Sequence, residues 1–379
     1  MRVLIAGAGI AGLTLSALLR QKGIKPQIVD RASDFAQAGY MLGLFPMGNR
    51  VLHGLGAFDA FVRRSEPMDT YALCNGHGET MQTFDIASAL GKFGATRQLP
   101  RADLLEILRD CAPDVPLSMG TRVTTLVEQG DEVEAFAGEE SLGRFDLVVG
   151  ADGIHSAARR HVAGEVEMRP TGWGAWVWWA PAEAAPHKLV TEYWGAGRFV
   201  GVYPVGNKIG VIAAGPIDEI GHERIDGSGA RLAELFDAYQ GIARAPFAAM
   251  PADDKDMFFW NLEDCRAPQW FKGRVALMGD AACAFLPTAG VGASMAMESA
   301  AVLADELGRT DARGMALALK HYETRRRKRA EGAQTASRRI AALMFVKSTP
   351  VAWGRDQLMK FYSIEEFAKE IEKSLDEPI

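Results

Sequence analysis

Three glycines close to the N-terminus form the segment of the sequence best suited to bind a charged ligand. Gly7, Gly9 and Gly12 lie between a strand-like apolar run, residues 2–6, and a helical stretch, residues 13–22. Gly7 permits a tight turn, Gly9 lets the backbone approach a pyrophosphate, and Gly12 allows the helix to pack on the strand. Amide groups at the start of the helix would face the phosphate charge. The residues predicted to bind a dinucleotide here are Gly7, Gly9, Ile10, Ala11 and Gly12.

An acidic residue ends the second predicted strand, residues 27–29. Asp30 follows the glycines by about twenty residues, where a carboxylate accepts hydrogen bonds from the adenosine ribose. Arg31 is expected to flank the adenosine, although an exposed arginine after a strand explains it equally well. The order of strand, turn, helix, strand and acid favours a dinucleotide site over a chance glycine-rich turn. It does not distinguish FAD from NAD, because both cofactors use the same contacts.

Two later segments also place an aspartate directly after a predicted buried strand. Residues 145–149 run into Gly150-Ala151-Asp152-Gly153, and residues 275–278 run into Gly279-Asp280-Ala281-Ala282. By itself each is a strand capped by a turn, which is a common arrangement. Pro287 follows the second segment, and a long helix is predicted from about residue 294 to residue 307.

Taken together in this order, the three segments resemble the flavoprotein aromatic hydroxylases of the para-hydroxybenzoate hydroxylase type, over most of the chain. The resemblance implies an α/β fold, with a Rossmann-like FAD-binding domain, an inserted antiparallel β-sheet domain and C-terminal helices. It implies that the first glycine motif binds the ADP half of FAD, and that the second segment lies near the pyrophosphate and helps NADPH or NADH to bind. The late Gly-Asp pair would hold the ribitol. The residues so assigned are Asp152, Gly153, Gly279 and Asp280.

Further cofactor contacts come from an arginine and from a late glycine loop. A cation in the first turn of a helix is disfavoured by the helix dipole, so another group should hold Arg101 after Pro100. The resemblance implies that Arg101 contacts FAD; a solvated surface arginine is the alternative. Amides at the start of the late helix could stabilise the reduced flavin ring, and the resemblance makes Pro287 a wall of its pocket. The predicted loop residues are Gly290, Val291, Gly292 and Ala293.

The sequence departs from the family pattern at four positions around the flavin. Cys283 stands where the family usually has histidine, and Val291 and Ser294 replace a glutamine and an asparagine. Ser299 replaces an aspartate on the following helix. These changes leave contacts made by the backbone intact and put in doubt how the flavin edge and the reductant are positioned.

Composition excludes several other classes of protein. The chain has 379 residues, 48% of them hydrophobic, and a formal net charge of −6, which argues against binding to nucleic acid or to anionic membranes. There is no apolar stretch long enough to span a bilayer and no basic leader, so a cytoplasmic enzyme is expected, as a monomer or homodimer. The four cysteines and seven histidines form no metal-binding pattern, and no Gly-x-Ser-x-Gly motif occurs. The chemistry should therefore come from a cofactor.

The middle of the chain is predicted to form an antiparallel sheet that carries the substrate. Residues 168–260 are rich in aromatic residues with strand-like alternation, and Gly206-Asn207 is a hairpin signal. Core packing is the common role of aromatic residues in a sheet. The candidate substrate contacts are Trp178, Tyr193, Arg198 and Tyr203. The expected domains are 1–71, 97–167 and 265–345 for FAD, 72–96 and 168–264 for the substrate, and 346–379 as a C-terminal helical segment.

By resemblance, we expect a monooxygenase that uses NADPH or NADH and dioxygen to hydroxylate a small aromatic or electron-rich substrate through a flavin hydroperoxide. No catalytic base can be assigned from the sequence. The same flavin chemistry also supports Baeyer–Villiger or epoxidising reactions. Residues 176–181 match a Trp-x-Trp-x-x-Pro pattern that suggests a flavin-dependent halogenase. A binding protein of this fold without catalysis is the remaining alternative.

Overall fold

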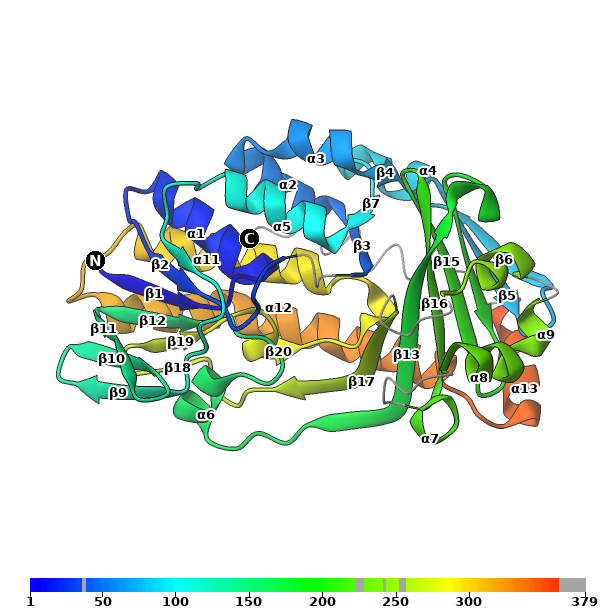
Figure 1. Cartoon of the computed structure of the whole chain (residues 1–379). Coiled ribbons are helices and arrows are strands. Elements are labelled where there is room, and N and C mark those ends of the chain that lie inside the picture. Colours follow the sequence, from blue (N-terminus) through cyan, green and yellow to red (C-terminus); the bar gives the residue numbers. More distant parts are fainter. Residues whose placement is uncertain (36–38, 222–227, 241–242, 252–256, 361–379) are drawn as a thin grey trace.

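The computed structural model describes residues 1–35, 39–221, 228–240, 243–251 and 257–360. Two large sheets lie side by side, one flanked by helices and the other standing across its end (Figure 1). The α/β fold with an inserted, mainly antiparallel sheet and C-terminal helices is confirmed.

The six-stranded sheet carries the N-terminal strand at its centre. Its strands are parallel except for an antiparallel edge pair. In order across the sheet they are β18 (Phe271–Lys272), β19 (Val275–Leu277), β12 (Leu147–Gly150), β1 (Val3–Ala6), β2 (Gln27–Val29) and β8 (Leu117–Ser118). Strands β1, β12 and β19 are fully buried, which explains their uninterrupted apolar sequences. Because they are parallel, their carboxyl ends bring the three predicted cofactor segments to one edge.

Helices cover this sheet, and two small sheets extend it. The helices of this region are α1 (Ile10–Gln21), α2 (Pro46–Leu55), α3 (Phe58–Arg64), α5 (Arg101–Asp110), α6 (Ala157–Ala163), α11 (Gly292–Leu307) and α12 (Met315–Met344). One small sheet consists of β9 (Thr125–Gln129), β10 (Glu132–Ala137) and β11 (Glu140–Phe145); the other consists of β3 (Met41–Leu44), β4 (Glu66–Pro67) and β7 (Arg97–Pro100). Helix α12 runs from the first large sheet to the second (Figure 1).

The eight-stranded sheet is antiparallel except for the pairing of β14 with β5. In order it contains β20 (Cys283–Ala284), β17 (Phe258–Arg266), β13 (Arg169–Pro181), β16 (Lys208–Pro216), β15 (Phe199–Val205), β14 (Leu189–Trp194), β5 (Thr70–Asn75) and β6 (Thr80–Asp85). The predicted turn at Gly206-Asn207 is confirmed, since it joins β15 to β16. The strand β5 begins at Thr70, so the expected domain boundary after residue 71 falls inside this strand.

Short helices close the outer face of this sheet, and others lie at its edges. They are α4 (Ile86–Leu90), α7 (Ile217–Ile220), α8 (Ser228–Leu235), α9 (Asp237–Gln240), α10 (Arg244–Ala248) and α13 (Thr349–Met359). Helix α13 packs beside β6. The rest of the expected C-terminal segment, 361–379, lies outside the described residues. None of the helices among the described residues is both long and apolar enough to cross a membrane.

A buried ion cluster joins α11 to α12 and α2. The fully buried carboxylate of Glu298 accepts hydrogen bonds from Arg326 at 3.0 Å, from Arg329 at 2.9 Å and from Arg50. Although burial alone would raise it, Arg326 and Arg329 hold the pKa of Glu298 below its usual value. Arg326 itself is only 1% exposed, so the basic run at 325–329 is partly interior.

Removing the charge of Glu298 should strongly destabilise the fold, because Arg326 would remain buried without its anionic partner. We expect Glu298→Gln to lower the free energy of unfolding by about 3 kcal/mol or more. The control is Glu106→Gln, which breaks an exposed pair with Arg64 and should cost less than about 1 kcal/mol. Urea unfolding followed by circular dichroism measures both; equal, small effects would contradict the expectation.

Candidate functional site

A cavity of about 490 Å³ lies between the carboxyl edge of the six-stranded sheet and one face of the eight-stranded sheet. Gly7, Gly9 and Asp30 line one part of it, and Tyr203 and Trp260 line another. Most of the sequence-predicted cofactor positions line this cavity. They are Gly7, Gly9, Ile10, Ala11, Asp30, Arg31, Arg101, Asp152, Gly153, Gly279, Asp280, Pro287, Gly290, Gly292 and Ala293.

The glycine turn is shaped by close backbone contacts. Gly7 adopts φ +114°, and a Cβ there would lie 2.2 Å from the carbonyl oxygen of Ala151. A Cβ on Gly12 would lie 1.9 Å from the carbonyl oxygen of Gly7. Gly12 therefore packs helix α1 onto the turn and does not line the cavity. Gly9 is the residue before α1, and a Cβ there would meet only Arg101, at 3.8 Å. The turn thus leaves an open cradle at the start of α1 that fits a pyrophosphate.

Asp30 fixes the glycine turn and also faces the cavity. One carboxylate oxygen accepts a hydrogen bond from the amide of Ala8 at 2.6 Å, and the other accepts from the amide of Ala32 at 2.8 Å. Each oxygen keeps a second lone pair that is free to accept from a ribose hydroxyl. The carboxylate is therefore positioned by the chain before any ligand binds.

Arg101, at the first position of α5, is held by groups that the sequence did not reveal. Its guanidinium lies over the ring of Tyr40, 5.5 Å from the centroid, and both residues line the cavity. Arg101 also attracts the carboxylate of Asp280. These two interactions explain how a cation is tolerated at the start of a helix.

Asp280 lies three residues after β19, where it is exposed at the cavity that it lines. Desolvation by the surrounding protein raises its pKa to about 6, and Arg101 and Arg159 limit this rise. It follows Gly279, which adopts φ +60° and whose Cβ would lie 3.0 Å from Ala11 on α1. The Gly-Asp segment consequently lies directly against the first helix.

Asp152 and Arg159 join the second cofactor segment to the third. Asp152 lies before α6, whose N-terminal cap is Ser156, and accepts a hydrogen bond from the amide of Ala157 at 2.7 Å and another from the Ser156 hydroxyl group. The buried Arg159 donates to the carbonyl oxygens of Asp280 and Ala281 at 3.4 and 3.3 Å. Sequence analysis did not include Arg159 in the site; its signal was an arginine on the helix that follows Gly-Ala-Asp-Gly.

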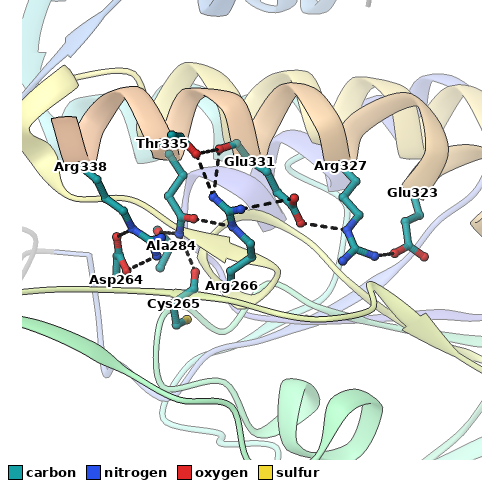
Figure 2. Close-up of polar contacts among 10 residues, drawn as sticks. Asp264, Cys265, Arg266, Ala284, Glu323, Arg327, Glu331, Thr335 and Arg338 are labelled. Atoms are coloured by element: carbon teal, nitrogen blue, oxygen red, sulfur yellow. Dashed lines mark hydrogen bonds and ion pairs between the residues drawn. The ribbon is translucent and has the colours of Figure 1, made fainter. Parts of the chain in front are cut away.

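Helix α12 anchors the strand and loop that carry Pro287. Gln334 donates to the carbonyl oxygens of Cys265 at 2.8 Å and of Ala284, so it connects β17 with β20. Arg338 forms a bidentate ion pair with Asp264, in which two guanidinium N–H groups donate to the two carboxylate oxygens (Figure 2).

The same helix fixes the loop itself. Ser337 donates to the carbonyl oxygen of Leu286 at 2.6 Å, and Thr288 donates back to the carbonyl oxygen of Ser337 at 2.7 Å. These bonds hold both neighbours of Pro287. Gly290 then turns the chain with φ +65° into α11, and Val291 is buried as its N-terminal cap.

The positions that depart from the family pattern have structural partners. Burial raises the pKa of the Cys283 thiol to about 12, so it stays protonated. The Ser294 hydroxyl accepts from the amide of Phe45 at 3.3 Å, and the Ser299 hydroxyl accepts from Arg326 at 3.3 Å. Neither Cys283, Ser294 nor Ser299 lines the cavity.

Three predicted substrate contacts lie away from the cavity, and this expectation is corrected. Trp178 is fully buried against Phe247 on the outer face and donates to the carbonyl oxygen of Pro246 at 3.0 Å. Tyr193 packs against the same outer cluster, and Arg198 pairs with Glu219 at 2.7 Å. For Trp178 and Tyr193 the physical reason is strand alternation, because neighbouring residues point to opposite faces and the outer face is covered by α8 and α10. Arg198 lies in the turn between β14 and β15.

Tyr203 does line the cavity, together with residues that sequence analysis missed. Ile212 and Trp260 project from the same face of the sheet, and the Trp260 ring packs 4.8 Å from that of Tyr40. The missed lining residues also include Met41, Leu42, Phe285 and Leu286. Their apolar side chains carried no signal that separates a pocket wall from a core.

The tryptophan motif is explained by packing. Trp176, like Trp178, is fully buried, and its indole donates to the carbonyl oxygen of Ile220 at 3.3 Å. The described residues contain no group of three or more His, Cys, Asp or Glu side chains that could hold a metal ion.

Comparison with known proteins identifies the family. A family model described as an FAD binding domain matches residues 1–337. The chain is 31% identical to 3-amino-4-hydroxybenzoate 2-monooxygenase of Streptomyces cremeus, over 95% of this chain and 92% of that protein. It is 30% identical to salicylate hydroxylase of Pseudomonas putida, over 95% and 89% of the two chains.

Among solved structures, HpxO of Klebsiella pneumoniae in complex with FAD and uric acid superposes with a TM-score of 0.89. The two chains are 25% identical, and the match covers 99% of this chain and 96% of HpxO. With the cradle at the glycine turn and the Gly-Asp segment that lies against α1, these similarities show that the chain belongs to the FAD-dependent aromatic hydroxylase family and is a flavoprotein monooxygenase.

Proposed function

We propose that this monooxygenase uses NADPH or NADH and dioxygen to hydroxylate a small aromatic or electron-rich molecule bound against the inner face of the eight-stranded sheet. The observation that carries the proposal is that one cavity joins the cofactor segments to Tyr203, Ile212 and Trp260. Relatives that act on aminohydroxybenzoate, salicylate and hydroxynicotinate support an aromatic ring as the substrate.

Separate parts of the chain would hold the two halves of FAD. Amides at the start of α1 face the pyrophosphate, Asp30 accepts from the adenosine ribose, and Asp280 accepts from the ribityl chain. The isoalloxazine would lie by Pro287, with the start of α11 directed at it. When bound, FAD supplies the electron-transfer and oxygen-activating chemistry.

The walls of the cavity would bind the substrate and exclude water from it. Met41, Phe285 and Leu286 present apolar surface, and Tyr40 and Trp260 form a tilted aromatic pair in the wall. Exclusion of water protects a reactive oxygen species from unproductive decay. The hydrogen bonds that Ser337 on α12 makes with Leu286 and Thr288, the two neighbours of Pro287, would keep this wall fixed.

The proposal places the enzyme in the cytoplasm as a monomer or homodimer. All four cysteines are free, which fits a reducing compartment that also supplies NADPH and NADH.

Substrate screening tests the activity directly. The purified FAD-loaded enzyme should oxidise NADPH or NADH faster with some members of a panel of hydroxybenzoates, aminophenols, hydroxypyridines and quinolones. Product masses should show the gain of one oxygen atom. Chlorinated products, or no substrate-stimulated consumption of dioxygen across the panel, would contradict the proposal.

The pH dependence of FAD binding tests the role of Asp280. Because its pKa is about 6 in the cofactor-free protein, its carboxylate accepts best above that pH. FAD affinity should therefore fall as the pH is lowered through about 6. Asp280→Asn should weaken FAD binding by about tenfold or more and remove this pH dependence.

Fluorescence titration of FAD with the cofactor-free protein measures both effects. Asp114→Asn, which changes an exposed partner of Arg20, serves as the control and should behave as the unmodified protein. An unchanged pH profile in Asp280→Asn would rule out this role.

A further inference from the structure

A carboxylate beneath the cavity wall is bonded to two tyrosines and a tryptophan. Glu192 lies on β14 and accepts hydrogen bonds from the Tyr203 hydroxyl at 2.8 Å on Oε1. On Oε2 it accepts from the Tyr71 hydroxyl at 2.7 Å and from the Trp194 indole at 3.0 Å. Of these residues only Tyr203 lines the cavity.

The described part of the chain places no cation against this carboxylate. Among the residues that the structure describes, no arginine, lysine or histidine pairs with Glu192, and its partners are the three neutral donors. Burial raises the pKa of Glu192, and those hydrogen bonds oppose the rise. A desolvated carboxylate without a counter-ion lowers the stability of the fold. Its presence here therefore indicates a specific use for the two oxygens that accept hydrogen bonds.

The carboxylate fixes the direction of the Tyr203 hydroxyl. A carboxylate can only accept, so the Tyr203 hydroxyl donates its proton to Oε1, as the Tyr71 hydroxyl and the Trp194 indole donate theirs to Oε2. Burial and the Glu192 carboxylate raise the pKa of Tyr203 and Tyr71 well above the usual value, so both hydroxyls keep their protons. Because its proton is directed at Glu192, the Tyr203 oxygen has only lone pairs to offer a molecule bound in the cavity that Tyr203 lines.

Gly201, which lies on β15 with Tyr203, leaves room for the Tyr203 ring to reach Glu192. Gly201 is paired with Glu192 across β14 and β15, and the Tyr203 ring lies over it. A Cβ on Gly201 would lie 2.4 Å from the ring carbon Cε2 and 2.6 Å from the hydroxyl oxygen. The ring can therefore lie back over the strand, and its hydroxyl reaches Glu192.

We propose that Glu192 is a specificity-determining positioning residue, which makes Tyr203 a hydrogen-bond acceptor and so selects aromatic substrates that present an O–H or N–H group to it. This inference rests on the proposed function, because it names the chemistry of the substrate bound in that site. The chain from substrate to Tyr203 to Glu192 would also polarise the substrate O–H bond, because linked hydrogen bonds strengthen one another. Polarisation in this direction makes the ring more electron-rich.

The test compares matched probes bound to the oxidised, FAD-loaded enzyme without turnover. The probes are 2-naphthol, which can donate a hydrogen bond, and 2-methoxynaphthalene, which can only accept one. Affinities are measured near neutral pH from the change in the flavin absorbance spectrum. The unmodified enzyme should bind the naphthol more tightly by roughly threefold to tenfold, the range expected for one hydrogen bond.

Glu192→Gln should abolish or reverse this preference. Trp194 requires an acceptor, so the glutamine oxygen would stay beside it and the amide nitrogen would face Tyr203. That nitrogen donates to the Tyr203 oxygen and releases the hydroxyl proton toward the cavity. The ratio of affinities should therefore fall to about one or below, which a loss of packing alone would not produce.

Two further variants keep the test decisive if Glu192→Gln folds poorly. Tyr203→Phe should abolish the discrimination and retain flavin, whereas Tyr193→Phe, on the opposite face of β14, should keep the full ratio. Equal affinities in the unmodified enzyme, an unchanged ratio in Glu192→Gln or Tyr203→Phe, or no binding of either probe would overturn the inference. Since no turnover is measured, these outcomes are independent of the substrate screen.

Discussion

The structure depends on the close approach of three parallel strand ends at one edge of a sheet. At Gly7 a single added carbon would lie 2.2 Å from the backbone of the Gly-Ala-Asp-Gly segment, and at Gly279 one would meet the first helix. Short contacts of this kind leave little room for sequence change. They bring together segments that lie far apart in the chain, and they leave an open cradle where the first helix begins.

The second sheet uses this edge as the base of its cavity. Its inner face supplies Tyr203, Ile212 and Trp260, and its outer face is sealed by α8 and α10. Helix α12 connects the two parts, because Gln334 and Ser337 bond to the strand and loop that lead to Pro287. Backbone contacts thus determine the shape of the cofactor-binding part of the site. Side chains on the eight-stranded sheet determine the shape of the substrate-facing part.

This difference explains what the sequence could and could not predict. Gly7, Gly12, Asp30 and the two later aspartates were recognisable, because the backbone there requires particular residue types in a fixed order. The substrate-facing side chains of the sheet were not recognisable. Trp178 and Tyr203 are both aromatic residues in predicted strands, and the sequence does not say which face of the sheet is covered by helices. Partners distant in sequence, such as Tyr40 with Arg101, or Glu192 with Tyr71, were also out of reach, because they depend on how strands pair.

A crystal structure of the enzyme grown with FAD tests the central claim most directly. We expect the pyrophosphate at the amides that begin α1, the ribityl chain beside Asp280, and the flavin ring between Pro287 and the face that carries Trp260. An FAD molecule bound elsewhere, or a cavity that remains without flavin at saturating FAD, would contradict this account of how the chain works.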